Sequence, residues 1–212
     1  MSSEARYGQP PVDMGLFDIE TGEMMFYLYL PVKMPNFADA YPERLKPFWS
    51  IYTAVSTSDY VKPWHIYIYM TVKTLWVEPG SPGNRPGWHI DGYGSNGDLN
   101  FIWSDMNPTE FAVQPFHDIP DDDFESMAEI TRQVDPSKIV TYPDKHLLML
   151  DESVVHRVAE TVTAGVRTFV KVSVSEHRYN LKGNSHNYLI PYSWEMHDRS
   201  DVRNLDNKDF VK

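Results

Sequence analysis

The sequence predicts a mainly β fold, a double-stranded β-helix (jelly roll) with a few flanking helices. About eight short segments are apolar runs or alternate apolar with polar residues, as strands do. Turn-forming residues separate these segments at short intervals, and strands do not alternate with long helices, which argues against a parallel βαβ sheet. A length of 212 residues suits one domain. We therefore expect a single domain over 1–212, with the jelly-roll core at roughly 64–176 and an extension at each end.

Three elements are expected in the first part of the chain. The apolar run "MMFYLYLPV" (24–32) predicts a strand, and 36–55 predicts one or two short helices because prolines interrupt it. The segment "WHIYIYMTVKTLWVE" (64–78) predicts a long strand. Its two faces are Ile66, Ile68, Met70 and Val72 on one side and Tyr67, Tyr69, Thr71 and Lys73 on the other.

The second part predicts more strands and one helix. Segments 98–105 and 110–118 look like a hairpin joined by "MNPT". The segment "IPDDDFESMAEITRQV" (119–134) predicts a helix, and its run of three aspartates suits a helix start better than a second metal site. Four short strands are expected next, at 137–142, 146–151, 154–160 and 165–176.

Composition narrows the class of function. A net charge of −11 repels phosphate backbones, which disfavours nucleic acid as a partner. Because the chain has no cysteine, any metal must be bound by His, Asp, Glu or backbone oxygen. The N-terminal residues lack the pattern of a signal peptide, and the longest apolar run is too short to span a bilayer. We expect a cytoplasmic protein that does not contact a membrane.

The stretch "GWHIDG" (87–92) contains a candidate pair of metal ligands. His89 and Asp91 are two residues apart, so on a strand they point the same way, although a polar turn would contain the same residues. A distant His156 is followed eleven residues later by Arg167, a spacing that fits two antiparallel neighbouring strands. Two histidines and one carboxylate on one side of a metal are the ligands of many non-haem Fe(II) oxygenases. Arg167 would then offer a planar fork for a carboxylate.

These residues resemble the Fe(II)/2-oxoglutarate-dependent dioxygenases, and most closely their prolyl-hydroxylase-like branch. Three stretches carry the resemblance, which covers roughly 76–175: "GWHIDG", "NFIWSDMNPTEF" and "KHLLMLDESVVHRVAETVTAGVRTFVKVSV". The segment from His156 to Arg167 is the most specific part. The chain departs from the family where "NPTEF" replaces the usual double glycine of the hairpin, and where the expected cosubstrate-binding tyrosine is not obvious.

The resemblance implies a function and its residues. His89, Asp91 and His156 would bind Fe(II), and Arg167 would pair with the distal carboxylate of 2-oxoglutarate. With O₂, such an enzyme hydroxylates or otherwise oxidises an unactivated C–H bond and releases succinate and CO₂. Apart from the resemblance, the acidic charge, the short chain and the glycine-rich loops on either side of His89 suit a small molecule, an amino acid or a peptide side chain as the substrate. A second cosubstrate contact is sought among Trp103, Asn100, Tyr67 and Tyr69, although the two tyrosines also suit a plain core role.

Other interpretations remain open from the sequence. The chain is alternatively a different metal-dependent enzyme of the cupin type, or a non-catalytic jelly-roll binding module. Arg167 and Lys171 also suit the polar, exposed face of their strand, and for Lys171 exposure is the favoured interpretation. His117 and Asp118 are a poor ligand pair because neighbours in a strand point to opposite faces.

Overall fold

The computed structural model of the chain describes residues 6–91 and 97–199, and these residues form a mainly β structure. The strands are β1 (Val12–Leu16), β2 (Met25–Lys33), β3 (Tyr67–Val77), β4 (Leu99–Ser104), β5 (Glu110–Ala112), β6 (Ile139–Thr141), β7 (His146–Leu150), β8 (His156–Arg157) and β9 (Gly165–Ser175). The helices are α1 (Trp49–Ser56) and α2 (Asp123–Gln133), with short 3₁₀ helices η1 (Glu43–Phe48) and η2 (Pro136–Lys138). No helix in the described ranges has the length and apolarity needed to cross a bilayer.

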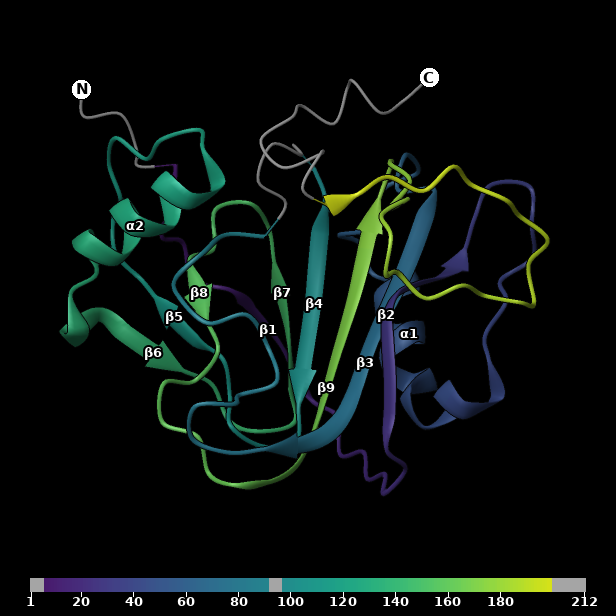
Figure 1. Ribbon diagram of the computed structural model, residues 1–212, viewed down its shortest axis with the longest axis horizontal. Coiled ribbons are helices and arrows are strands. Elements are labelled where there is room, and N and C mark those ends of the chain that lie inside the picture. The colour runs from purple at the N-terminus through teal and green to yellow at the C-terminus, as the bar shows by residue number, and fades with distance from the viewer. Residues whose placement is uncertain (1–5, 92–96, 200–212) are drawn as a thin grey trace.

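The strands form two antiparallel sheets. The larger has six strands in the order β1-β7-β4-β9-β3-β2, and the smaller has the order β6-β5-β8. The long pair β3 and β9 runs in unbroken register from Tyr67 opposite Ser175 to Val77 opposite Gly165. Residues 88–90 extend the small sheet, because His89 and His156 form an antiparallel bridge. Figure 1 shows the small sheet and α2 on one side of the long central strands, and α1 on the other.

Side-chain alternation divides the core into layers. One face of the large sheet, which includes Val170, Val172 and Val174, packs against η1 and α1. The opposite face, which includes Ile102 and Leu148, packs against the inner side of the small sheet. The outer side of the small sheet is covered by α2, whose Ile130 is fully buried there. The odd-numbered residues of β9, among them Arg167 and Lys171, therefore face the space between the two sheets.

Most predicted elements are confirmed. The strand at 24–32, the helical segment within 36–55 and the long strand at 64–78 are present as β2, η1 with α1, and β3. The helix expected at 119–134 is α2, and the Asp122 side chain caps it by accepting from the backbone N–H groups of Phe124 and Glu125. The sequence did not predict β1, which pairs with β7 at the edge of the large sheet.

Two predicted strand pairings are wrong. The strands at 98–105 and 110–118 do not form a hairpin: β4 belongs to the large sheet and β5 to the small one. The strands of His156 and Arg167 are not neighbours either, because β8 pairs with β5 and β9 lies between β3 and β4. In both cases the connecting segment crosses from one sheet to the other. His156 and Arg167 thus face the same inter-sheet space from opposite sides.

Candidate metal centre

The alternation of residues 88–91 directs the two ligand candidates inward. Trp88 and Ile90 are buried in the cluster beneath α2. On an extended segment their neighbours His89 and Asp91 must then point to the other side, into the space between the sheets. The backbone N–H of His89 donates to the carbonyl of His156, and the N–H of His156 donates back to the carbonyl of His89, each at 2.9 Å. This closely bonded pair brings the two imidazole rings to a centroid distance of 4.5 Å.

Backbone carbonyls fix the orientation of both imidazoles. Nδ1 of His89 lies 2.9 Å from the carbonyl oxygen of Gly87, and Nδ1 of His156 lies 3.2 Å from that of Val154. A carbonyl can only accept, so each Nδ1 carries a proton, and Nε2 is the nitrogen that each ring can offer to a metal ion. Burial, and next the proximity of His89, lowers the pKa of His156 to about 4, so this imidazole is neutral at pH 7. His156 is therefore in the state that binds a metal ion, and the ring of His89 is held in an orientation that offers Nε2 as its ligand atom.

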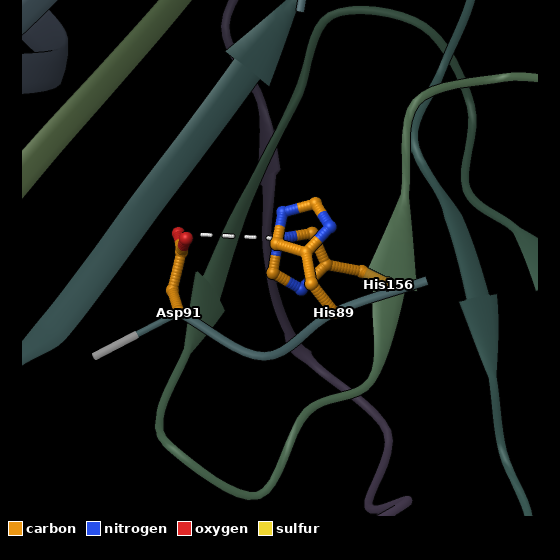
Figure 2. A group of neighbouring side chains, drawn as sticks. All are labelled: His89, Asp91 and His156. Carbon is orange, nitrogen blue, oxygen red and sulfur yellow. Dashed lines mark ion pairs between the residues drawn. The ribbon is translucent and has the colours of Figure 1, made fainter. Parts of the chain in front are cut away.

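Asp91 completes the group. Its Oδ2 lies 3.9 Å from Nε2 of His156, and one donor atom from each of His89, Asp91 and His156 lies within 4.8 Å of the others. Figure 2 shows His89 and Asp91 reaching from one segment toward His156 on β8. Burial alone would raise the pKa of the Asp91 carboxyl, but Lys171 and the two histidines hold it well below its ordinary value. Two imidazoles and one carboxylate at these separations suit a single divalent metal ion.

Lys171 lies beside this group, and the prediction that its side chain is exposed is wrong. Its Nζ donates to Oδ2 of Asp91 and to the hydroxyl of Tyr29, each at 3.1 Å, and only 12% of its side chain is exposed. Burial would lower the pKa of Lys171, but Asp91 and Tyr29 raise it, so the ammonium stays charged. Sequence reasoning missed Tyr29 altogether, because nothing in its local pattern distinguishes it from the other residues of β2.

A second cation lies near Arg167 on the same sheet face. A small pocket between β3, β9 and the loop after β3, which in this conformation has no room for a whole water molecule, is lined by Lys73, Leu75, Val77, Gly83, Asn84, Arg167 and Phe169. Nζ of Lys73 donates to the carbonyl of Gly83 at 3.1 Å and to Oδ1 of Asn84 at 3.0 Å, both uncharged acceptors. Burial, followed by repulsion from Lys171 and Arg167, lowers the pKa of Lys73. Lys73 was not singled out from the sequence, although its place on the Tyr67–Thr71 face was predicted.

Arg167 is buried rather than exposed. Only 2% of the residue is accessible, Nε donates to the carbonyl of Met106 at 2.9 Å, and Nη2 donates to that of Asn107 at 3.2 Å. Burial lowers the pKa of Arg167 to about 10, and Asp105 and Asp144 oppose the change. The guanidinium therefore stays charged at neutral pH, and it contributes to the wall of the pocket.

The other candidate cosubstrate contacts lie elsewhere. Trp103 is on the opposite face of the large sheet, in the core beneath α1, and its Nε1 donates to the carbonyls of Phe17 and Lys145. Tyr67 and Tyr69 are on the inter-sheet face but at the other end of β3 from Leu75, which pairs with Arg167. Tyr69 is fully buried, and its hydroxyl donates to the carbonyl of His177. The structure thus brings Arg167 together with Lys73 and not with Tyr67, Tyr69 or Trp103.

Comparison of the chain with models of known families, with curated proteins and with solved structures gave no match. The function must therefore be argued from the geometry of the site.

Proposed function

We propose that the protein is an Fe(II)- and 2-oxoglutarate-dependent oxygenase. The observation that carries the proposal is the group of His89, Asp91 and His156 on one side of the inter-sheet space. Two histidines and one carboxylate leave the remaining coordination positions of an iron ion free for a cosubstrate and O₂. The strand arrangement supports a double-stranded β-helix, since β4, β7 and β9 of the large sheet pack against the small sheet, which residues 88–90 extend.

The charges around the site support an anionic cosubstrate. Three buried or half-buried cations, Lys73, Arg167 and Lys171, lie on the face of the large sheet that is turned toward the inter-sheet space, which the candidate ligands enter from the small sheet. Asp91 is paired with Lys171, and Asp105 and Asp144 act on Arg167, so the acids and the cations balance. A divalent ion would add two positive charges to this poorly hydrated region, and a dicarboxylate would neutralise them.

The residues have separate roles in this proposal. His89, Asp91 and His156 hold the ion, while Arg167 and Lys73 bind the distal carboxylate of 2-oxoglutarate in the pocket between β3 and β9. Bound iron, with 2-oxoglutarate and O₂, supplies oxidation of a substrate C–H bond with release of succinate and CO₂. The carbonyls of Gly87 and Val154 hold the two imidazoles in fixed orientations. The substrate class we propose is a small molecule, an amino acid or a peptide side chain, because the net charge of −11 disfavours nucleic acid.

Anaerobic spectroscopy tests the proposal directly. Protein loaded with Fe(II) should develop a weak visible charge-transfer band when 2-oxoglutarate is added, and His89→Ala and His156→Ala should each abolish both the band and iron binding. His117→Ala is the matched control, because His117 is exposed and lies outside the ligand group. Iron-loaded wild-type protein that gives no band with 2-oxoglutarate would refute the proposal. Succinate production with panels of amino acids, peptides and small metabolites then identifies the substrate.

A further inference from the structure

Lys171 binds the Asp91 carboxylate and is itself held by the hydroxyl of Tyr29. Lys171 is in the middle of β9, and its ammonium lies between Oδ2 of Asp91 and the hydroxyl of Tyr29, at 3.1 Å from each. The three residues come from β2, β9 and the segment after residue 88, so only the tertiary fold brings them together. A buried lysine is costly unless its charge is paired, and here the pair is with a metal-ligand candidate.

The backbone around Tyr29 is shaped to present its hydroxyl. Between Tyr27 and Leu30, β2 advances three residues while its partner β3 advances two, so the strand has a bulge. Tyr29 has a φ of 47°, a left-handed conformation that is uncommon for a residue other than glycine. The backbone N–H of Tyr29 donates to the hydroxyl oxygen of Thr71, and Thr71 pairs with Lys171 across β3 and β9. Strained backbone that neighbouring contacts hold in place is typical of functional sites.

The bulge is also fixed from the C-terminal side. The N–H of Leu28 donates to the hydroxyl of Ser185, and the N–H of Ser185 donates to the carbonyl of Leu28. The ring of Tyr29 packs edge-on against Tyr179, with centroids 5.2 Å apart. Contacts from three parts of the chain therefore hold Tyr29 against Lys171.

We propose that Lys171 is a positioning residue for the metal centre. Held by Tyr29, its ammonium bonds to Oδ2 of Asp91, the oxygen that also lies 3.9 Å from Nε2 of His156, so this oxygen is not free to join Oδ1 in chelating an ion, and the carboxylate would bind the ion through a single oxygen. A chelating carboxylate would take a coordination position that a bidentate cosubstrate needs. The same positive charge repels the ion, so Lys171 weakens metal binding while it keeps coordination positions open. This inference rests on the proposed metal-dependent function.

Cobalt(II) is a suitable probe, because its visible spectrum reports coordination number without turnover. For Lys171→Met we expect Co(II) to bind at least tenfold more tightly and its visible spectrum to change before any cosubstrate is added. We also expect 2-oxoglutarate to bind the cobalt-loaded variant at least tenfold more weakly than it binds the cobalt-loaded wild type. Lys171→Arg keeps a cationic donor and should restore the spectrum and the 2-oxoglutarate affinity to within about threefold of wild type. Tyr29→Phe should shift all three measurements in the direction of Lys171→Met, by less. Lys46→Met, at an exposed lysine, is the control and should match wild type.

The outcomes separate this inference from the proposed function. If Lys171→Met keeps the wild-type Co(II) spectrum, or loses metal affinity together with thermal stability, Lys171 is a structural residue and the inference is overturned. If Lys171→Met does not fold, Tyr29→Phe decides by the same spectrum. Wild-type protein that binds Co(II) but not 2-oxoglutarate would refute the oxygenase, whereas the spectrum of the metal-bound variants would still decide the role of Lys171. Wild-type protein that binds no divalent metal would overturn both.

Discussion

Lys73→Met should separate cosubstrate binding from metal binding and from folding. Lys73 is half-buried, its two hydrogen-bond acceptors are uncharged, and the charged groups that lower its pKa are the cations Lys171 and Arg167. Methionine keeps most of the side-chain length and removes the charge. The change therefore deletes an anion contact while it largely preserves the packing of the pocket.

The expected size follows from the chemistry of the lost contact. A hydrogen bond from an ammonium to a carboxylate contributes about 1.5–3 kcal/mol, so the Kd for 2-oxoglutarate should rise about 10- to 150-fold. The free energy of unfolding should change by no more than about 1 kcal/mol, since two bonds to neutral oxygens are lost while a repelled, half-buried charge is removed. Metal affinity should stay within a few-fold of wild type, because the pocket is distinct from the three ligands.

Calorimetric titration of the Zn(II)- or Co(II)-loaded protein is the assay. Pyruvate is a matched control ligand, since it has the 2-oxo acid group without the distal carboxylate, and its Kd should be the same for wild type and Lys73→Met. Lys46→Met controls for the loss of a surface charge. Equal Kd values for 2-oxoglutarate in wild type and Lys73→Met would show that the cationic pocket does not bind the distal carboxylate.

Three further predictions concern stability. The pKa of His156 is about 4 in the folded protein and 6.5 ordinarily, so between these pH values the unfolded chain takes up a proton that the folded metal-free protein does not. Up to about 3 kcal/mol of unfolding free energy should therefore be lost as the pH falls from 6.5 to 4. Denaturant titrations of His156→Gln across this range should lack that pH dependence, and an unchanged pH dependence would contradict the lowered pKa of His156. Leu147→Ala, at a fully buried site, should cost about 2–5 kcal/mol in urea unfolding, whereas Leu189→Ala, at a site 61% exposed, should cost less than about 0.5 kcal/mol. Asp122→Ala removes the cap of α2 and should lower the unfolding free energy by about 1 kcal/mol, while Asp122→Asn should be close to neutral if capping is the cause.

Two of the three metal-ligand candidates could be predicted from the sequence because they are only two residues apart. His89 and Asp91 must share a side of an extended segment, and Trp88 and Ile90 indicate which side is buried beneath a helix. Only His156 had to be supplied from a distant segment, and the likeness of its spacing to Arg167 to that of the resembled family identified it, although the strand pairing inferred from that spacing was wrong. The alternation of β9 likewise predicted that Arg167, Phe169 and Lys171 share a face.

What the sequence could not show depends on contacts between distant segments. The four residues "MNPT" looked like a hairpin loop, but the segment crosses from the large sheet to the small one. Hydrogen bonds between Asn107 and the backbone of Thr163, and from Arg167 to the loop carbonyls, hold it in this path. Lys171 looked exposed because Asp91 and Tyr29, which compensate its burial, come from far along the chain. Trp103 looked available as a pocket residue because a strand pattern does not say which of two buried faces meets the ligand.

The reciprocal backbone bonds between His89 and His156 have a consequence for local unfolding. They join the segment before residue 92 to the edge of the small sheet. The neighbouring residues on these two segments are Trp88, Ile90 and Val155, and they pack against α2. An ion bound across His89 and His156 would act as a cross-link that closes a long loop, much as a disulfide restricts an unfolded chain. Amide hydrogens of the small sheet and α2 should therefore exchange more slowly when metal is bound, while those of the large sheet, whose opening does not break that link, should change little.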